Sequence, residues 1–266
     1  MRTFLIFLLF FLLAGTACSP RAPDEEAERV LFVGNSLTYV GNLPAVYSAL
    51  ATANGHPTES DMIVRGGATL TQRVSDGSVE KALSHRAYGV LVLQERGGDF
   101  TCSFGPDSCV ESRSALEELA GLAKKKGLRV VLLGTYQPHP NSSKKIVERE
   151  SAAANEAGIA YAEVSERLQR LREAEPDLGW FAEDGMHPGR ELALLNAMLI
   201  YQALHGTWPT AQPLQVKGPI YGTTSGLDER LRRAEDPAPL PETPSDVSYS
   251  SDTLKRLLRV ISSAGS

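Results

Sequence analysis

The chain has 266 residues, of which 42% are hydrophobic, and its formal net charge is −5 with acidic and basic residues well mixed. The one basic run, at residues 124–126, lies at the end of a predicted helix, so the charge pattern gives no sign of a nucleic-acid-binding surface. This length and apolar content allow one large domain with a full core, or two small ones.

Residues 1–17 are predicted to be an export signal. Arg2 supplies a positive charge, and residues 4–13 form an unbroken apolar run that is too short to span a bilayer. Small residues follow at positions 14–17, as they do before a signal-peptidase cleavage site. The fold is therefore expected to begin after this segment.

The position of Cys18 predicts how the exported chain is processed. The segment "LAGTAC" resembles a bacterial lipoprotein box, with Gly15 at the position of the usual leucine. The resemblance implies a lipid anchor on Cys18, hence a membrane-attached lipoprotein of the cell envelope, in the periplasm or at the outer membrane. Simple secretion after cleavage at Ala17 and a retained anchor are the alternatives. Residues 18–28 are polar and resemble a tether.

From residue 29 onward, apolar strand-like segments alternate with amphipathic helix-like segments. The strands are expected at 30–33, 61–64, 88–95, 128–136 and 159–164, and the helices at 43–54, 76–85, 112–127, 144–157, 165–174 and 190–206. The middle strands are apolar at nearly every position, which is typical of a parallel sheet that is buried on both faces. We therefore predict a single α/β domain over residues 29–206, with helices on both sides of a mostly parallel five-stranded sheet.

The regular order weakens after residue 206. Residues 207–248 are rich in proline and show little periodicity, and residues 251–264 are expected to form one amphipathic helix. The whole extension, 207–266, is predicted to pack on the same domain.

Two cysteines remain besides Cys18, and both lie in the short polar segment "TCSFGPDSC". In an oxidising compartment Cys102 and Cys109 are expected to form a disulfide. A zinc site is the weaker alternative, because two thiols leave two ligand positions unfilled. The surrounding loop, 97–111, is predicted to be either a lid over the site or a stapled surface loop.

The chemistry of the chain is expected where the parallel strands end, because ligands bind there in such sheets. Ser36 follows the first strand, and a serine needs a base to become a nucleophile. Among five histidines, His139 and His187 lie in suitable loops, and His187 is favoured because Asp184 stands three residues earlier and can orient its ring. The alternative is that Ser36 only opens a helix.

Hydrolysis of an ester also requires donors for the oxyanion. The candidates are the N–H of Ser36, the N–H groups of the glycine pair after the second strand, of which Gly67 is favoured, and the side chain of Gln94 after the third strand. A possible substrate pocket is assigned to four residues near these strand ends: Asn35, Gly66, Glu95 and Tyr136.

Three short segments in this order resemble the SGNH/GDSL hydrolase superfamily. They are "GNSLT" at 34–38, "GGAT" at 66–69 and "DGMHP" at 184–188. The resemblance implies a flavodoxin-like three-layer α/β/α fold, with Ser36 as nucleophile, Gly67 as oxyanion donor, and Asp184 and His187 completing a triad. It covers residues 29–206.

Two positions depart from the family pattern. Asn35 replaces the aspartate that is common in the family's first block, and "LQERGGD" stands where the third block usually carries an asparagine in a Gly-x-Asn-Asp setting. Gln94 is the expected substitute for the missing asparagine, because some carbohydrate-esterase-like branches use a glutamine-containing variant.

The resemblance implies an exported serine esterase that cleaves small acyl esters, acetyl esters on glycans first among them, through an acyl-enzyme. No metal or organic cofactor is expected. A lipase or thioesterase of the same superfamily is one alternative. A non-catalytic surface lipoprotein that binds a glycan or a protein is another. A metal-dependent phosphodiesterase would need Asp and His ligands at the first strand end, where Asn35 and Ser36 stand instead.

Overall fold

The computed structural model describes residues 26–237 and 247–265. The predicted signal segment and Cys18 lie outside the described residues. Within those residues, no helix is both long enough and apolar enough to cross a membrane.

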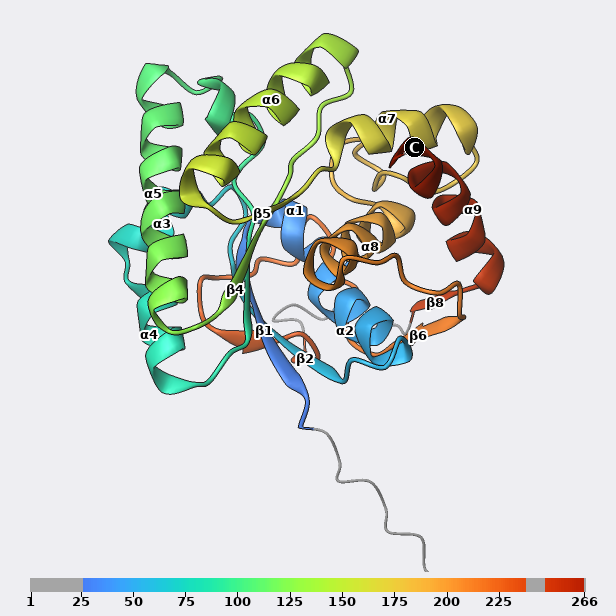
Figure 1. The fold of residues 1–266 in the computed structure, drawn as a ribbon, viewed down its shortest axis with the longest axis horizontal. Helices are drawn as coiled ribbons and strands as arrows, with labels where there is room; N and C mark the ends of the chain where they lie inside the picture. The colour runs from blue at the N-terminus through green and yellow to red at the C-terminus, as the bar shows by residue number, and fades with distance from the viewer. Residues whose placement is uncertain (1–25, 238–246, 266) are drawn as a thin grey trace, which may run out of the picture.

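A six-stranded sheet forms the centre of the fold (Figure 1). Its order is β5-β4-β3-β1-β2-β7, and every neighbouring pair is parallel except β2 with β7. The strands are β1 (Glu28–Gly34), β2 (Thr58–Val64), β3 (Val90–Leu93), β4 (Arg129–Leu133), β5 (Ala160–Ala162) and β7 (Arg232–Arg233). The five predicted parallel strands are confirmed, and their order is that of a flavodoxin-like sheet.

Each face of the sheet is covered by its own layer of helices (Figure 1). Alternate residues of β1 supply the two cores, because successive side chains point to opposite faces of a strand. Val30 and Phe32 belong to one core cluster, whereas Leu31 and Val33 belong to the other. The three-layer α/β/α architecture is therefore as predicted.

The first layer contains a helix that is buried almost all round. The helices of this layer are α2 (Leu43–Ala53), α7 (Ser165–Ala174), α8 (Arg190–His205) and α9 (Ser251–Ile261). Residues 192–201 of α8 are all buried, since this helix packs between the sheet and the neighbouring helices. The second layer comprises α3 (Leu70–Ser75), α4 (Ser78–His85), α5 (Pro106–Lys125) and α6 (Pro140–Ala157).

Two short helices at strand ends were not predicted. They are α1 (Ser36–Tyr39) and α3, and both are too short to show a helical period. The start of α3 nevertheless carries a readable signal, because Thr69 and Gln72 form a capping box. In addition, α5 begins at Pro106, earlier than expected, because proline is well suited to the first turn of a helix.

The segment around the two cysteines is a compact turn followed by a helix. A 3₁₀ turn, η1 (Asp99–Thr101), precedes Cys102, and Cys109 lies in the first turns of α5. Cys102 and Cys109 form a disulfide, as predicted. The staple therefore ties the loop after β3 to the start of α5.

The C-terminal segment adds strands and one helix to the domain. β6 (Leu214–Val216) and β8 (Val247–Tyr249) form a small antiparallel sheet, and β7 extends the main sheet. The helix α9 buries Leu254, Leu257 and Ile261 in the same core cluster as α8, and it is followed by a 3₁₀ turn, η2 (Ser262–Gly265). Because β7 contains only two residues, the sequence shows no alternating pattern that would predict it.

Replacement of Leu257 by alanine is expected to lower the free energy of unfolding by about 2–5 kcal/mol, because this side chain is fully buried and its removal leaves a cavity. Denaturant unfolding measures the change. Lys255→Ala, on the exposed side of the same helix, serves as the control and should change stability by less than about 0.5 kcal/mol. Equal effects of the two substitutions would contradict the packing of α9 described above.

Candidate active site

Ser36 is the first residue of α1, and only Asn35 separates it from the end of β1 at Gly34. The turn between them needs a glycine, since a Cβ at Gly34 would lie 2.2 Å from Oγ1 of Thr38. Asn35 caps α1 by accepting a hydrogen bond from the N–H of Leu37 at 3.0 Å. The abrupt change from strand to helix thus sets Ser36 at the carboxyl edge of the sheet.

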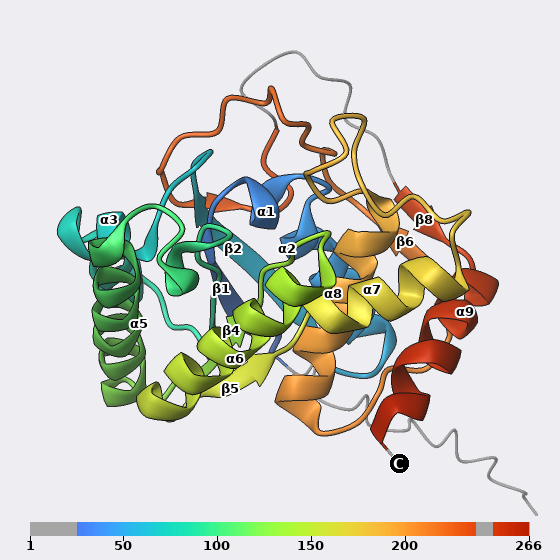
Figure 2. The same cartoon turned by 90° about the horizontal axis from the view of Figure 1, so that it is seen from above.

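The structure brings the three residues of the predicted triad together in one hydrogen-bonded chain. His187 Nε2 lies 2.9 Å from Ser36 Oγ, although the two residues are 151 positions apart. His187 Nδ1 lies 2.5 Å from Asp184 Oδ2. In Figure 2, α1 lies next to the loop that precedes α8 and carries His187. This geometry is that of a nucleophile, a base and an orienting carboxylate.

The turn that holds Asp184 and His187 is ordered by its own backbone. Asp184 Oδ1 accepts hydrogen bonds from the N–H groups of Met186 and His187, each at 2.9 Å. Gly185 adopts a φ of 68°, which favours glycine, and Ala182 N–H donates to the carbonyl of His187. The three-residue spacing therefore lets one carboxylate bind both the backbone and the imidazole.

These hydrogen bonds favour the ionised form of Asp184. The N–H of His187, then its ring, then the N–H of Met186 lower the pKa of Asp184 to about 2. The carboxylate is therefore ionised at neutral pH and accepts the Nδ1 proton of His187. That tautomer leaves the Nε2 lone pair directed at Ser36.

Tyr136, which follows β4, binds the backbone of this turn. Its hydroxyl donates to the carbonyl of Met186 at 2.7 Å, and the residue is only 8% exposed. The sequence suggested a wall of the substrate pocket for Tyr136, whereas its contact is with the backbone next to His187. His139, the other histidine considered as a base, accepts from the N–H of Asn141 at the start of α6.

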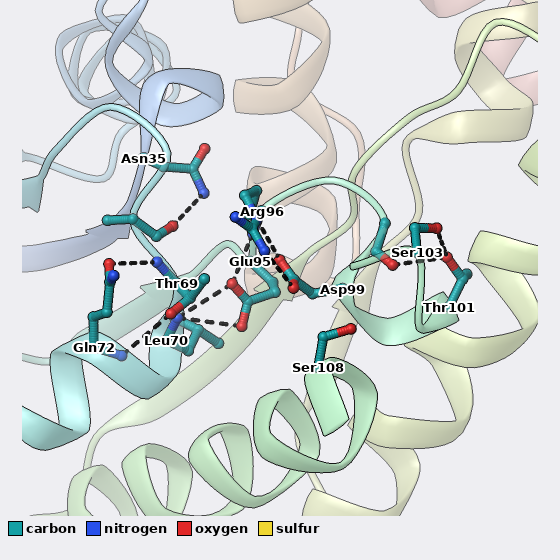
Figure 3. Close-up of polar contacts among 12 residues, drawn as sticks. Asn35, Thr69, Leu70, Gln72, Glu95, Arg96, Asp99, Thr101, Ser103 and Ser108 are labelled. Carbon is teal, nitrogen blue, oxygen red and sulfur yellow. Dashed lines mark hydrogen bonds and ion pairs between the residues drawn. The ribbon is translucent and has the colours of Figure 1, made fainter. Parts of the chain in front are cut away.

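The glycine pair after β2 lies beside the Ser36 turn. Gly66 and Gly67 are exposed, Gly67 has a φ of 68°, and a Cβ at Gly67 would meet no atom within 4 Å. The next residue, Ala68, accepts a hydrogen bond from the side chain of Asn35 at 3.2 Å (Figure 3). Gly67 therefore occupies an open position in a loop that is tied to the residue before Ser36.

Gln94 does not have the placement that the sequence suggested. Its Oε1 accepts from Thr38 Oγ1 at 2.7 Å, its Nε2 donates to the carbonyl of Gly134 at 3.3 Å, and it is only 1% exposed. A donor for an oxyanion must reach the open site, and a side chain that is buried between α1 and the end of β4 does not. Gln94 instead joins three segments, and the expected side-chain donor is not supported.

Asn35 and Glu95 are also placed differently from the expected pocket wall. Asn35 is 1% exposed, and Glu95 is fully buried. Glu95 accepts hydrogen bonds from the N–H groups of Leu70 and Arg96 (Figure 3). Arg96 pairs with Asp99 through two hydrogen bonds of 2.9 Å. A single sequence does not reveal such burial, because charged residues after a strand are usually exposed.

A second buried carboxylate lies at the end of β4. Glu150 of α6 accepts hydrogen bonds from the N–H and the hydroxyl of Thr135 and from Tyr161. Burial raises the pKa of both Glu95 and Glu150 to about 7, although the hydrogen bonds oppose the shift. Among the described residues, no group of three or more His, Cys, Asp or Glu side chains is arranged to hold a metal ion.

Comparison with known proteins identifies solved structures that have a similar fold. No family model and no curated protein sequence matches the chain. A proposed SGNH hydrolase from Slackia heliotrinireducens superposes with a TM-score of 0.55 at 24% identity, covering 67% of this chain and 99% of that one. A DUF4886 family protein from Bacteroides uniformis gives 0.56 at 18% identity, covering 68% and 84%.

A third solved structure with this fold is a variant of the acetyl xylan esterase Axe2 from Geobacillus stearothermophilus. Its TM-score is 0.52 at 14% identity, with 67% of this chain and 94% of that chain covered. The chain therefore has the α/β/α fold of SGNH hydrolases, as the resemblance implied.

Replacement of Asp184 by asparagine is expected to lower kcat of ester hydrolysis by roughly 10³–10⁴-fold, because the amide favours the wrong tautomer of His187. Initial rates with p-nitrophenyl acetate measure the loss. Glu183→Gln, an exposed neighbour in the same turn, is the control and should retain the wild-type rate. A loss below about tenfold in the Asp184 variant would contradict the assigned geometry.

The raised pKa of Glu150 is expected to make the protein less stable as pH rises. The unfolded chain ionises near pH 4.5 and the folded chain near pH 7, so the folded state holds the extra proton between these values. The free energy of unfolding should therefore decrease as pH rises across this window. Glu150→Gln should abolish the part of this decrease that is due to Glu150, which is about 3 kcal/mol at most. Urea unfolding at a series of pH values measures the slope, and an unchanged slope in the variant would contradict this assignment.

Proposed function

We propose that this protein is a serine esterase of the SGNH type that hydrolyses small acyl esters. One observation carries the proposal, namely the continuous chain from Ser36 Oγ to His187 Nε2 at 2.9 Å and from His187 Nδ1 to Asp184 Oδ2 at 2.5 Å. A serine that only opened a helix would have no need of an imidazole held by an ionised carboxylate. The exposed edge position of Gly67 beside this chain supports the same reaction.

The reaction proceeds in two steps. His187 takes the proton of Ser36 as Oγ attacks the acyl carbon, and the N–H groups of Ser36 and Gly67 stabilise the oxyanion. The intermediate collapses as His187 protonates the leaving alcohol, which leaves an acyl group on Ser36. His187 then removes a proton from water as the water attacks the acyl carbon. The second intermediate collapses as His187 returns this proton to Ser36 Oγ, and the acid is released. Asp184 stabilises the imidazolium at both stages.

Two backbone donors serve the oxyanion in this proposal. Gln94 is left out, because its amide is buried and bonded to Gly134 and Thr38. Loss of a single oxyanion donor typically costs about 10²–10³ in rate, so the exact placement of Gly67 matters for turnover.

An acetyl group on a glycan is the proposed substrate class. Support comes from the sequence-based expectation of an exported lipoprotein anchored through Cys18, which would meet glycans outside the cytoplasm, and from the likeness in fold to an acetyl xylan esterase. A lipase-type activity is the second candidate. Met186, next to His187, is 61% exposed and offers apolar surface to a longer acyl chain.

Purified protein is expected to hydrolyse p-nitrophenyl acetate, and Ser36→Ala should lower this rate to near the uncatalysed level, because the acyl-enzyme cannot form. Ser48→Ala is the matched control and should retain activity. The Ser48 hydroxyl lies in α2 and is hydrogen-bonded to the hydroxyl of Ser60. Butyrate and octanoate esters extend the measurement to longer chains.

Equal rates for the wild-type protein and Ser36→Ala would refute the proposal and favour a non-catalytic binding lipoprotein. A rate that rises from acetate to octanoate would favour the lipase over the acetyl esterase. Release of acetate from acetylated xylan oligosaccharides, measured beside the Ser36 variant, tests the glycan directly.

A further inference from the structure

The loop of residues 65–69, which carries Gly67, is held from two sides by buried polar side chains (Figure 3). Asn35, which precedes Ser36, donates from Nδ2 to the carbonyl of Ala68 at 3.2 Å. Glu95, which follows β3, accepts the N–H of Leu70 with both carboxylate oxygens at 3.2 Å. The two contacts are at Ala68 and Leu70, on either side of Thr69, so the nearer contact is one residue beyond Gly67.

We propose that Asn35 and Glu95 are positioning residues that fix the N–H of Gly67 relative to Ser36 Oγ. This inference rests on the proposed esterase function, in which that N–H binds the oxyanion. Neither side chain reaches the substrate, because Asn35 is 1% exposed and Glu95 is fully buried. Their effect passes through the backbone of the loop.

An amide is the side chain that the position of Asn35 requires. Oδ1 accepts from the N–H of Leu37 at 3.0 Å, while Nδ2 donates to the carbonyl of Ala68 at 3.2 Å. One partner is a donor and the other an acceptor, so the orientation of the amide is determined. An aspartate has no donor and would set a carboxylate oxygen against the Ala68 carbonyl.

Glu95 holds the other end of the loop and connects it to the next one. Leu70 is the first residue of α3, so its N–H has no partner within the helix and needs an acceptor. The same carboxylate also accepts the N–H of Arg96 at 2.8 Å. Arg96 in turn binds Asp99 and lies over the ring of Phe104, 3.6 Å from its centroid. The loop with Gly67 is thereby fixed to the segment after β3.

The chain offers a matched control for each of the two side chains. Asn42 is also buried, caps α2 by accepting from Ala45 N–H, and donates to the carbonyls of Pro219 and Ala234. Glu150 is a buried carboxylate that binds the N–H of Thr135 after β4. Neither contacts the loop of residues 65–69 through these bonds, so they report what an equal substitution does elsewhere in the core.

The test compares Asn35→Asp with Asn42→Asp and Glu95→Gln with Glu150→Gln in steady-state hydrolysis of p-nitrophenyl acetate. We expect Asn35→Asp and Glu95→Gln to lower kcat and kcat/KM together by roughly 10–100-fold with KM nearly unchanged, because the lost interaction acts in the transition state. The two control variants should keep kcat within about twofold. Thermal unfolding of all four variants confirms that each is folded at the assay temperature.

Protonation should partly rescue Asn35→Asp, because a neutral carboxyl regains a donor for the Ala68 carbonyl. The ratio of its kcat to that of the wild type is therefore expected to rise between pH 8 and pH 5. A purely structural loss would leave this ratio constant or lower it. Glu95→Gln is an independent second variant if Asn35→Asp does not fold.

A second readout does not depend on turnover. In amide NMR spectra, the Gly67 resonance is expected to shift in Asn35→Asp and Glu95→Gln and to stay in place in the two controls. The proposal is overturned if kcat and the Gly67 resonance are unchanged in the first pair, or if the controls lose as much activity. Failure of the esterase function gives a different result. The wild-type protein would then show no Ser36-dependent hydrolysis, whereas the Gly67 resonance would still report whether the two side chains fix the loop.

Discussion

Parallel pairing of β1 with β2 on one side and β3 on the other is the constraint on which the candidate site depends. Parallel neighbours end at the same edge, so the residues that follow these three strands are forced together whatever their separation in the chain. Ser36, Gly67 and Glu95 each follow one of the three. The two apolar clusters on either side of the sheet keep this register, since a slip by one residue would turn each strand's core-facing side chains to the wrong layer.

The base reaches this edge by a different route. Asp184 and His187 belong to no strand of the main sheet, and they lie in a turn just before α8, in which residues 192–201 are all buried. Packing of α8 against the sheet therefore sets where the turn lies, and the hydroxyl of Tyr136 fixes it to the end of β4. The carboxylate of Asp184 then orders backbone and imidazole at once, so a single side chain supplies both geometry and electrostatics.

The polar side chains next to the site are buried and hydrogen-bonded to the backbone of neighbouring segments. Gln94, Asn35 and Glu95 are all buried, and each bonds backbone groups of a neighbouring segment. Buried polar groups without partners are costly, so such side chains fix one arrangement of the loops and disfavour others. The open surface of the site is left to small residues, of which Gly66 and Gly67 are the exposed examples. A rigid, buried support beneath a small and open centre agrees with the proposed turnover of small acyl groups.

The sequence by itself determined the five parallel strands, the long helices, the Cys102–Cys109 pair and the candidate triad. These follow from local properties: apolar runs, helical periodicity, and the three-residue spacing that lets Asp184 reach His187. Only the tertiary structure decided what Gln94, Asn35, Glu95 and Tyr136 do. Each was expected at the pocket or the oxyanion, yet each binds a partner 25 to 56 residues away, and the direction of a hydrogen bond depends on where that distant partner lies. The two-residue strand β7 was not predicted for the same reason. It forms only by pairing with β2 at the edge of the folded sheet, and two residues show no strand pattern in the sequence.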